Sequence, residues 1–311
     1  MADRLKVHAM GLAFQNPVLV ASGTFGYGDE YWEVLPFSRL GGLVTKTITA
    51  SSREGNPPPR IVETDSGMLN SIGLANVGLE KFLAEKLPWI AEHANQARVV
   101  VNVAGFSTEE FVEVASAVGA RREVDALEIN LGCPNVKAGY IHFGADPDSI
   151  RRVIAGIRQK VNIPLIAKLT PSVTDIAALA EAAVDAGADG LSLINTLPGM
   201  KIDVKRCRPV LAMGFGGLSG PAVRPVGVAC VYKVYQQLTR MQAPVPIIGI
   251  GGITCAADAL EYVMAGASLV QVGTQNFVHP QAAGLVIEGL EEYCDSGNTR
   301  LSDLVGIAHE R

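Results

Sequence analysis

One cysteine lies in a segment whose residue types suit proton transfer. Residues 126–130 have the composition of a buried strand and are followed by turn residues, which places Cys133 on a loop at the carboxyl end of that strand. Two carboxamides, Asn130 and Asn135, flank the thiol. A thiol can act as a base or a nucleophile, although its unperturbed pKa of about 8.5 leaves only a small fraction ionised at neutral pH. The Asn-x-x-Cys-Pro-Asn frame favours Cys133 as the catalytic residue over the ordinary alternative, a half-buried structural cysteine.

Eight short apolar runs recur along the chain, and each ends in polar or glycine residues. Apolar strands that alternate with helices are typical of a parallel sheet covered by helices, and eight such units close a (β/α)8 TIM barrel of the α/β class. The helical periodicity between the runs supports this fold. The expected strands cover residues 18–22, 43–46, 99–103, 126–130, 165–169, 191–194, 247–250 and 269–272, and the expected helices cover residues 108–118, 148–161, 174–186, 221–238, 256–264 and 280–293.

A short hairpin is expected before the barrel, and two long insertions are expected within its βα loops. Residues 5–7 and 12–14 flank a Met-Gly turn, as in a small hairpin lid. The segments 47–78 and 197–220 are too long for simple connectors, and long loops in a compact domain are usually functional. We find no repeat or linker, and 311 residues fit one α/β barrel. We therefore expect residues 1–311 to form a single TIM-barrel catalytic domain.

Composition and charge argue against several classes of protein. The net charge of −5 and the pI of about 5.6 disfavour a nucleic-acid-binding protein. The N-terminus lacks the apolar region of a signal peptide, and no apolar run reaches ~18 residues, so we expect no membrane span. The five cysteines form no Cys-x-x-Cys pair, so we expect no metal site and no disulfide framework in this chain. Reduced thiols fit a cytoplasmic protein.

The predicted strand ends carry polar side chains that would converge. In a TIM barrel the chemistry lies at the carboxyl ends of the strands. Buried amides and ammonium groups without partners cost about 1–3 kcal/mol each, so a bound polar ligand would supply those partners. The predicted ring consists of Ser22, Lys46, Asn102, Asn130, Lys168, Asn195, Gly251-Gly252 and Gly273-Thr274.

The glycines after the last two strands suit a phosphate. Loops at these positions of a TIM barrel commonly bind phosphate through backbone N–H groups, and glycine lets the backbone approach closely. With Lys168 in the middle of the ring, this pattern suits flavin mononucleotide (FMN), because a lysine beside the flavin would stabilise its reduced form. FMN is favoured over a sugar phosphate because the amides could also pair with a planar heterocycle stacked on the flavin. Residues 70–74 are too apolar for a free linker, so they could fold over the ligand and present N–H groups to it. No Gly-x-Gly-x-x-Gly motif opens a helix, so nicotinamide is not expected on this chain.

Several motifs together resemble the class 1 dihydroorotate dehydrogenases, and in particular the catalytic subunit of the 1B type. The likeness runs from about residue 5 to residue 290. Class 1 enzymes use a cysteine base, whereas the membrane-linked class 2 enzymes use serine, so Cys133 fits class 1. The motifs are Ala21-Ser22-Gly23 with Phe25-Gly26, Gly55 to Arg60, Gly67 to Leu74, Asn130 to Lys137, and Gly216 to Pro221.

The resemblance implies an enzyme that oxidises dihydroorotate to orotate in de novo pyrimidine (UMP) biosynthesis. It implies that Cys133 removes the proton from C5 while the hydride on C6 passes to N5 of FMN, with no metal. It implies that substrate is bound by Lys46, Asn70, Ser71, Ile72, Gly73, Leu74, Asn130, Asn195 and Thr196, and that FMN is bound by Ser22, Lys46, Thr47, Asn102, Asn130, Lys168, Ile194, Gly220, Gly251, Gly252, Gly273 and Thr274.

The resemblance also implies a partner for electron transfer. In the 1B type, a homodimer of the FMN chain joins subunits that carry FAD and a [2Fe–2S] cluster, and the heterotetramer reduces NAD⁺. The alternatives are a 1A homodimer that passes electrons to fumarate, and a Schiff-base lyase with Lys168 or Lys46 as its nucleophile. A flavoprotein subunit that only carries electrons, and a reductase acting on dihydrouridine in RNA, are further alternatives; the acidic net charge disfavours the last.

Overall fold

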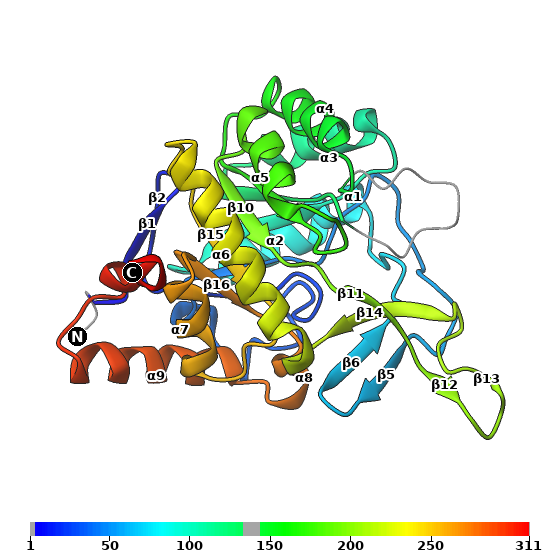
Figure 1. Ribbon diagram of the computed structural model, residues 1–311. Helices are drawn as coiled ribbons and strands as arrows, with labels where there is room; N and C mark the ends of the chain where they lie inside the picture. The colour runs from blue at the N-terminus through cyan, green and yellow to red at the C-terminus, as the bar shows by residue number, and fades with distance from the viewer. Residues whose placement is uncertain (1–3, 133–143, 311) are drawn as a thin grey trace.

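Eight parallel strands close a barrel at the centre of the protein, and helices surround it (Figure 1). The computed structural model describes residues 4–132 and 144–310. The strands follow one another around the barrel in the order β10-β15-β16-β3-β4-β7-β8-β9, which confirms the predicted TIM barrel. They are β3 (Val18–Val20), β4 (Gly42–Val44), β7 (Arg98–Val103), β8 (Ala126–Asn130), β9 (Leu165–Leu169), β10 (Gly190–Leu193), β15 (Ile247–Ile250) and β16 (Leu269–Val272).

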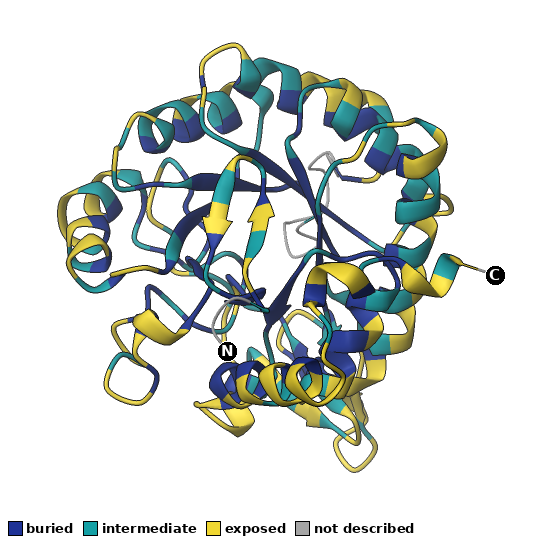
Figure 2. Cartoon of the chain, turned by 90° about the vertical axis from the view of Figure 1, so that its left-hand side faces the viewer, coloured by how far each residue is buried: buried dark blue, intermediate teal, exposed yellow. Residues whose placement is uncertain are grey.

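The helices bury one face against the barrel and expose the other, as Figure 2 shows. Six of them follow the predicted periodicity to within a few residues. Within residues 4–132 and 144–310, no helix has both the length and the apolar character needed to cross a membrane. The six are α3 (Thr108–Gly119), α4 (Pro147–Arg158), α5 (Ile176–Asp185), α6 (Arg224–Arg240), α7 (Ala256–Met264) and α9 (Ala282–Ser296), and the short α8 (Gln275–Val278) precedes the last.

One helical region lies where the sequence pattern predicts none. The region comprises α1 (Leu79–Lys81), a π-helical turn (Phe82–Lys86) and α2 (Leu87–His93). The predicted helix α3 is capped by Ser107, whose side chain accepts a hydrogen bond from the Glu110 N–H.

The predicted hairpin, β1 (Val7–Ala9) and β2 (Leu12–Phe14), lies across the amino-terminal mouth of the barrel (Figure 2). Ala9 and Phe14 pack against the first layer of inward-facing side chains, so the hairpin closes the bottom of the barrel with apolar contacts. Gly11 makes its turn with a φ of +74°, in open space. The apolar layer consists of Leu19, Val44, Val100, Ala126, Ile166, Ile248 and Leu269.

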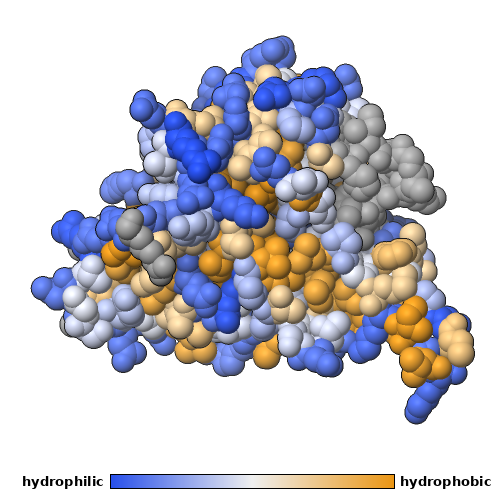
Figure 3. Space-filling view, viewed as in Figure 1, coloured by the Kyte–Doolittle hydropathy of each residue, from blue (hydrophilic) through white to orange (hydrophobic). Residues whose placement is uncertain are grey.

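The two long insertions pair with each other, which corrects the prediction that they are loops. Strands β5 (Ile61–Thr64) and β6 (Gly67–Asn70) from the first insertion join β11 (Leu197–Met200) and β14 (Phe215–Ser219) from the second in an antiparallel sheet. The small hairpin of β12 (Ile202–Asp203) and β13 (Arg208–Pro209) extends from it (Figure 1). Figure 3 shows apolar side chains on this projection, where Met200, Ile202, Val204 and Phe215 are exposed.

Candidate active site

The interior of the barrel changes from apolar to polar within two residues along several strands. Every second residue of a strand faces the same side, so the residues two positions beyond the apolar layer also point inward. Most of these are polar, although the strands around them are buried and apolar. This polar layer contains Asn102, Glu128, Lys168, Ser192 and Gln271, each less than a tenth exposed.

Glu128 is fully buried and lies at the centre of the polar layer. Its Oε1 atom accepts hydrogen bonds from Lys168 Nζ at 3.1 Å and from Asn102 Nδ2 at 2.6 Å, while its Oε2 atom accepts one from Gln271 Nε2 at 2.8 Å. Burial alone would raise the pKa of this carboxyl, but the ammonium and the two amides outweigh burial and lower the pKa below its ordinary value. Lys168 Nζ also donates to Ser22 Oγ at 3.3 Å, which joins two of the predicted cofactor residues.

Two buried amide oxygens of the polar layer have no hydrogen-bond partner among the described residues. They are the Asn102 Oδ1 and Gln271 Oε1 atoms. A buried polar atom without a partner is costly, by about 1–3 kcal/mol, and buried polar groups are rarely left unpaired. Their grouping around an ion pair therefore indicates that this layer meets a polar ligand.

The strand ends next to Cys133 are connected by side-chain amides. Asn130 Nδ2 donates to Thr47 Oγ1 at 3.4 Å, and Asn195 Nδ2 donates to Asn130 Oδ1 at 3.3 Å and to the Gly132 carbonyl at 2.7 Å. The Asn195 Oδ1 atom accepts from the Thr196 N–H at 2.8 Å. Cys133 and its neighbour Asn135 lie outside the described residues. The network thus fixes the chain up to the residue that precedes the predicted base.

Lys46 lies two residues after the end of β4, and its ammonium is available to a ligand. Its backbone N–H donates to the Gly26 carbonyl at 2.8 Å, which fixes the main chain. Within the described part of the chain, the Lys46 ammonium makes no ion pair or hydrogen bond. Ile194, another predicted cofactor residue, is buried and donates its N–H to the Ile250 carbonyl at 3.0 Å, so only its apolar side chain and carbonyl remain for a ligand.

The glycine turns after β15 and β16 bring several backbone N–H groups to one place. Gly252 has a φ of +66°, and a Cβ atom there would lie 2.7 Å from the Gly220 carbonyl oxygen. The N–H groups of Gly252, Gly273 and Thr274 donate no hydrogen bond to any described residue. Thr274 Oγ1 donates to Ser219 Oγ at 2.8 Å, which connects these turns to the inserted sheet. Close backbone approach and free N–H groups are what a phosphate requires.

The predicted substrate loop is ordered by its own contacts. Asn70 Nδ2 donates to the Gly217 carbonyl at 3.2 Å, so the loop is attached to the second insertion. Ser71 is 1% exposed and its hydroxyl accepts from Asn56 Nδ2 at 3.0 Å, so Asn56 holds this side chain in place. The N–H groups of residues 72–74 donate to no described residue, whereas the Ile72 and Gly73 carbonyls accept from the first insertion. The segment therefore has backbone donors that no described residue uses.

Several residues of this site are missed by the sequence analysis. Glu128 and Gln271 are polar residues within apolar strands, and their spacing of two from Asn130 and Gly273 is the signal that points to them. Tyr262 gave no signal: it is fully buried on α7 and its hydroxyl donates to the Gly251 carbonyl at 2.7 Å. Burial raises the pKa of this phenol, so Tyr262 stays a neutral donor that holds the turn.

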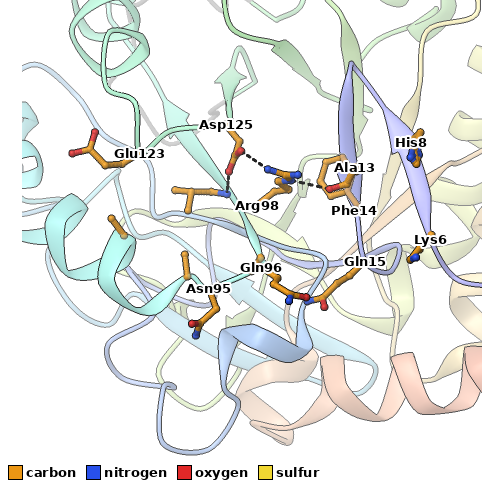
Figure 4. A pocket seen from close by; sticks show the side chains of 14 residues that line it. Lys6, His8, Ala13, Phe14, Gln15, Asn95, Gln96, Arg98, Glu123 and Asp125 are labelled. Atoms are coloured by element: carbon orange, nitrogen blue, oxygen red, sulfur yellow. Dashed lines mark hydrogen bonds and ion pairs between the residues drawn. The ribbon is translucent and has the colours of Figure 1, made fainter. Parts of the chain in front are cut away.

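A pocket of about 580 Å³ opens at the other end of the barrel, beside the hairpin (Figure 4). Arg98 lies in it, but its guanidinium donates to Asp125 Oδ1 at 3.0 Å and to the Ala13 carbonyl at 2.8 Å. The pocket lies at the amino ends of the strands, where residues of a TIM barrel serve stability. The candidate active site is therefore the polar layer and the turns above it.

The fold and this ring of side chains define a TIM-barrel protein whose site lies at the carboxyl ends of its strands. The family model of dihydroorotate dehydrogenase matches residues 4–294. A Pelobacter propionicus protein named dihydroorotate dehydrogenase B (NAD(+)), catalytic subunit, is 49% identical over 307 residues, which cover 98% of this chain and 99% of the relative. A protein of the same name from Desulforudis audaxviator is 48% identical over 310 residues, 99% of each chain. The chain belongs to the dihydroorotate dehydrogenase family.

A further relative carries the name of the other class 1 type. It comes from Aquifex aeolicus, is named provisionally as a dihydroorotate dehydrogenase A (fumarate), and is 49% identical over 306 residues, 98% of each chain. The relatives named as the B type and the relative named as the A type are equally similar to this chain, so the percentage identity does not distinguish the NAD⁺-linked type from the fumarate-linked type.

Proposed function

We propose that this chain oxidises dihydroorotate to orotate, as a step of de novo pyrimidine biosynthesis, with FMN bound at the carboxyl ends of the barrel strands. The observation that carries the proposal is the buried Lys168–Glu128 pair with unpaired amide oxygens around it, in a chain of this family. Glycine turns with free N–H groups at one side of the layer complete a site for a flat ring with a phosphate tail.

The residues of the site fit FMN. The free N–H groups of Gly252, Gly273 and Thr274 suit its phosphate, and the unpaired Asn102 Oδ1 atom suits a ring N–H. Bound FMN supplies the hydride acceptor. The residues proposed to hold it are Ser22, Lys46, Thr47, Asn102, Asn130, Lys168, Ile194, Gly220, Gly251, Gly252, Gly273 and Thr274.

The substrate would lie between the layer and the loop 70–74. The Lys46 ammonium and the free N–H groups of residues 72–74 suit the carboxylate of an anionic substrate. Cys133 is proposed as the base that takes the proton from C5, and the Asn195 amide donates to the carbonyl of Gly132, the residue that precedes it in the chain. The residues proposed to bind substrate are Lys46, Asn70, Ser71, Ile72, Gly73, Leu74, Asn130, Asn195 and Thr196.

The decisive experiment is anaerobic addition of dihydroorotate to the purified yellow protein. We expect the flavin colour to bleach in proportion to the substrate added, and orotate to be formed. A colourless protein that forms a borohydride-trapped adduct would instead support a Schiff-base lyase using Lys168 or Lys46. A yellow protein that dihydroorotate does not bleach would support a subunit that only carries electrons.

For the electron acceptor we propose NAD⁺, reached through a partner subunit that carries FAD and a [2Fe–2S] cluster. The relatives named as B-type catalytic subunits support this assignment, and the Aquifex relative supports the fumarate-linked homodimer as the alternative. Exposed apolar side chains on β11, β12 and β14 support contact with another protein. Iron and FAD assays on the native cytoplasmic complex, purified by size exclusion, would distinguish these assemblies. Iron and FAD would support the NAD⁺-linked complex, and their absence would support the fumarate-linked homodimer.

Replacing Gly252 by alanine should weaken FMN binding at least tenfold. The new Cβ would lie within 3 Å of the Gly220 carbonyl oxygen and the Arg224 Cβ, so the turn must shift. Gly11→Ala is the matched control, because Gly11 also has a positive φ but lies in open space at the far end of the barrel. Fluorescence titration with FMN gives both affinities, and equal losses in the two variants would contradict the assignment.

A further inference from the structure

Glu128 is assigned no contact with the cofactor or the substrate in the scheme above, although its buried side chain lies at the centre of the polar layer. It is fully buried, and its two oxygens accept three hydrogen bonds from Lys168, Asn102 and Gln271. Two of these donors belong to residues that we assign to FMN. Any change in the carboxylate therefore reaches the cofactor through side chains that touch it.

Stability alone does not require this carboxylate. The layer directly below is filled with apolar side chains, and a buried ion pair is often no more stabilising than apolar residues of similar volume. At Glu128 an ammonium and two amides, three donors in all, are directed at one carboxylate. The arrangement keeps a full negative charge in the floor of the cofactor site, next to the single positive charge of Lys168.

The two charges have opposite effects on a bound flavin. A positive group beside the flavin stabilises the negative charge of the reduced form, and a negative group opposes it, with little screening in a buried site. Since Lys168 Nζ lies 3.1 Å from Glu128 Oε1, the carboxylate offsets much of the effect of the ammonium and also holds it in one position between Glu128 and Ser22.

We infer that Glu128 is a positioning residue that holds Lys168 and Asn102 against the cofactor and, by compensating the charge of Lys168, lowers the reduction potential of the bound flavin. The inference rests on the proposed FMN site. A lower potential makes the reduced flavin a better donor to the next electron carrier, so the carboxylate favours onward transfer over retention of electrons.

The test is the reduction potential of FMN in Glu128→Gln, measured anaerobically against a reference dye. Glutamine keeps the shape and removes the charge, so the reduced form should gain at least tenfold over the oxidised form, a rise of about 30 mV for a two-electron couple. Gln271→Leu should act in the opposite direction, by about threefold, because it leaves both charges and removes a donor that stabilises the carboxylate. If the two substitutions acted only by disordering the site, the FMN reduction potentials of Glu128→Gln and Gln271→Leu would shift in the same direction.

Asp125→Asn is the control, because it removes one carboxylate from the amino end of the same barrel segment, where Asp125 pairs with Arg98. Its potential should equal that of the unmodified protein. If Glu128→Gln retains FMN with an unchanged or lower potential, the inference is wrong while the proposed function stands. If Glu128→Gln does not fold, an unchanged or raised potential in Gln271→Leu overturns the inference. Absence of FMN from the unmodified protein would instead refute the proposed function.

Discussion

Replacing Cys133 by serine should slow the reduction of bound flavin by dihydroorotate about 10²–10⁴-fold at neutral pH, the range expected for loss of a general base. A serine hydroxyl is a far weaker acid than a thiol, so almost none of it is ionised at this pH. The substitution changes little in size, and the Asn195 amide still holds the Gly132 carbonyl before it. The loss should therefore appear in the rate of a single anaerobic turnover and not in the binding of orotate.

The pH dependence of that rate identifies the base. In the unmodified enzyme the rate should rise with pH and level off above the pKa of the thiol, whereas in Cys133→Ser it should continue to rise over the whole accessible range. Cys207→Ser is the control, because Cys207 is exposed on the β12–β13 segment, far from the polar layer. A Cys133→Ser enzyme with an unchanged rate would remove this residue from the mechanism.

The sequence predicts the barrel well because each strand is a short apolar run that ends in a polar or glycine residue. That pattern reflects burial on both faces of a parallel strand, and it needs no knowledge of the partner strands. The same pattern predicts the site, since Asn130 and Lys168 interrupt otherwise apolar strands at their carboxyl ends. In the structure Lys168 donates to Ser22 and Glu128, whereas Asn130 is joined to Thr47 and Asn195.

Pairing between distant segments is what the sequence does not show. Strands β6 and β14 meet through a register of Asn70 with Gly217, and glycines at this seam carry no strand propensity. The helical region at residues 79–93 is hidden for a different reason, because it follows Gly78 without a side-chain cap and contains a proline near the start of α2. Glu128 can be picked out in the sequence as a charged residue within an apolar strand. Its role cannot, because that role depends on three hydrogen-bond donors from other strands.

Replacing Lys168 by methionine should lower the free energy of unfolding by about 3–5 kcal/mol at pH 7, because it leaves the Glu128 carboxylate buried without its cation. The side chains are similar in length, so packing is largely preserved. Lys168 Nζ is the only positive group paired with Glu128 among the described residues. Urea unfolding without added FMN, measured on both proteins after removal of flavin, keeps ligand binding out of the comparison.

The sign of the pH dependence distinguishes this mechanism from a packing defect. In the unmodified protein the pKa of Glu128 is lowered, so its stabilisation is present above the ordinary value of 4.5 and is lost only as the pH falls through the lowered pKa. Without Lys168, burial dominates and raises that pKa in the folded state. The variant should then lose stability as the pH rises above about 4.5, so the difference between the proteins should be larger at pH 7 than at pH 5.

Lys46→Met provides the matched comparison, because Lys46 also lies at the carboxyl end of a barrel strand, two residues after β4, but makes no ion pair among the described residues. Its effect on the free energy of unfolding should be small, and it should be the same at pH 5 and pH 7. A Lys168→Met protein with a pH-independent loss would mean that Glu128 is not ionised in the folded chain. Glu128 would then carry no negative charge in the cofactor site, and the three donors around it would not be stabilising a carboxylate.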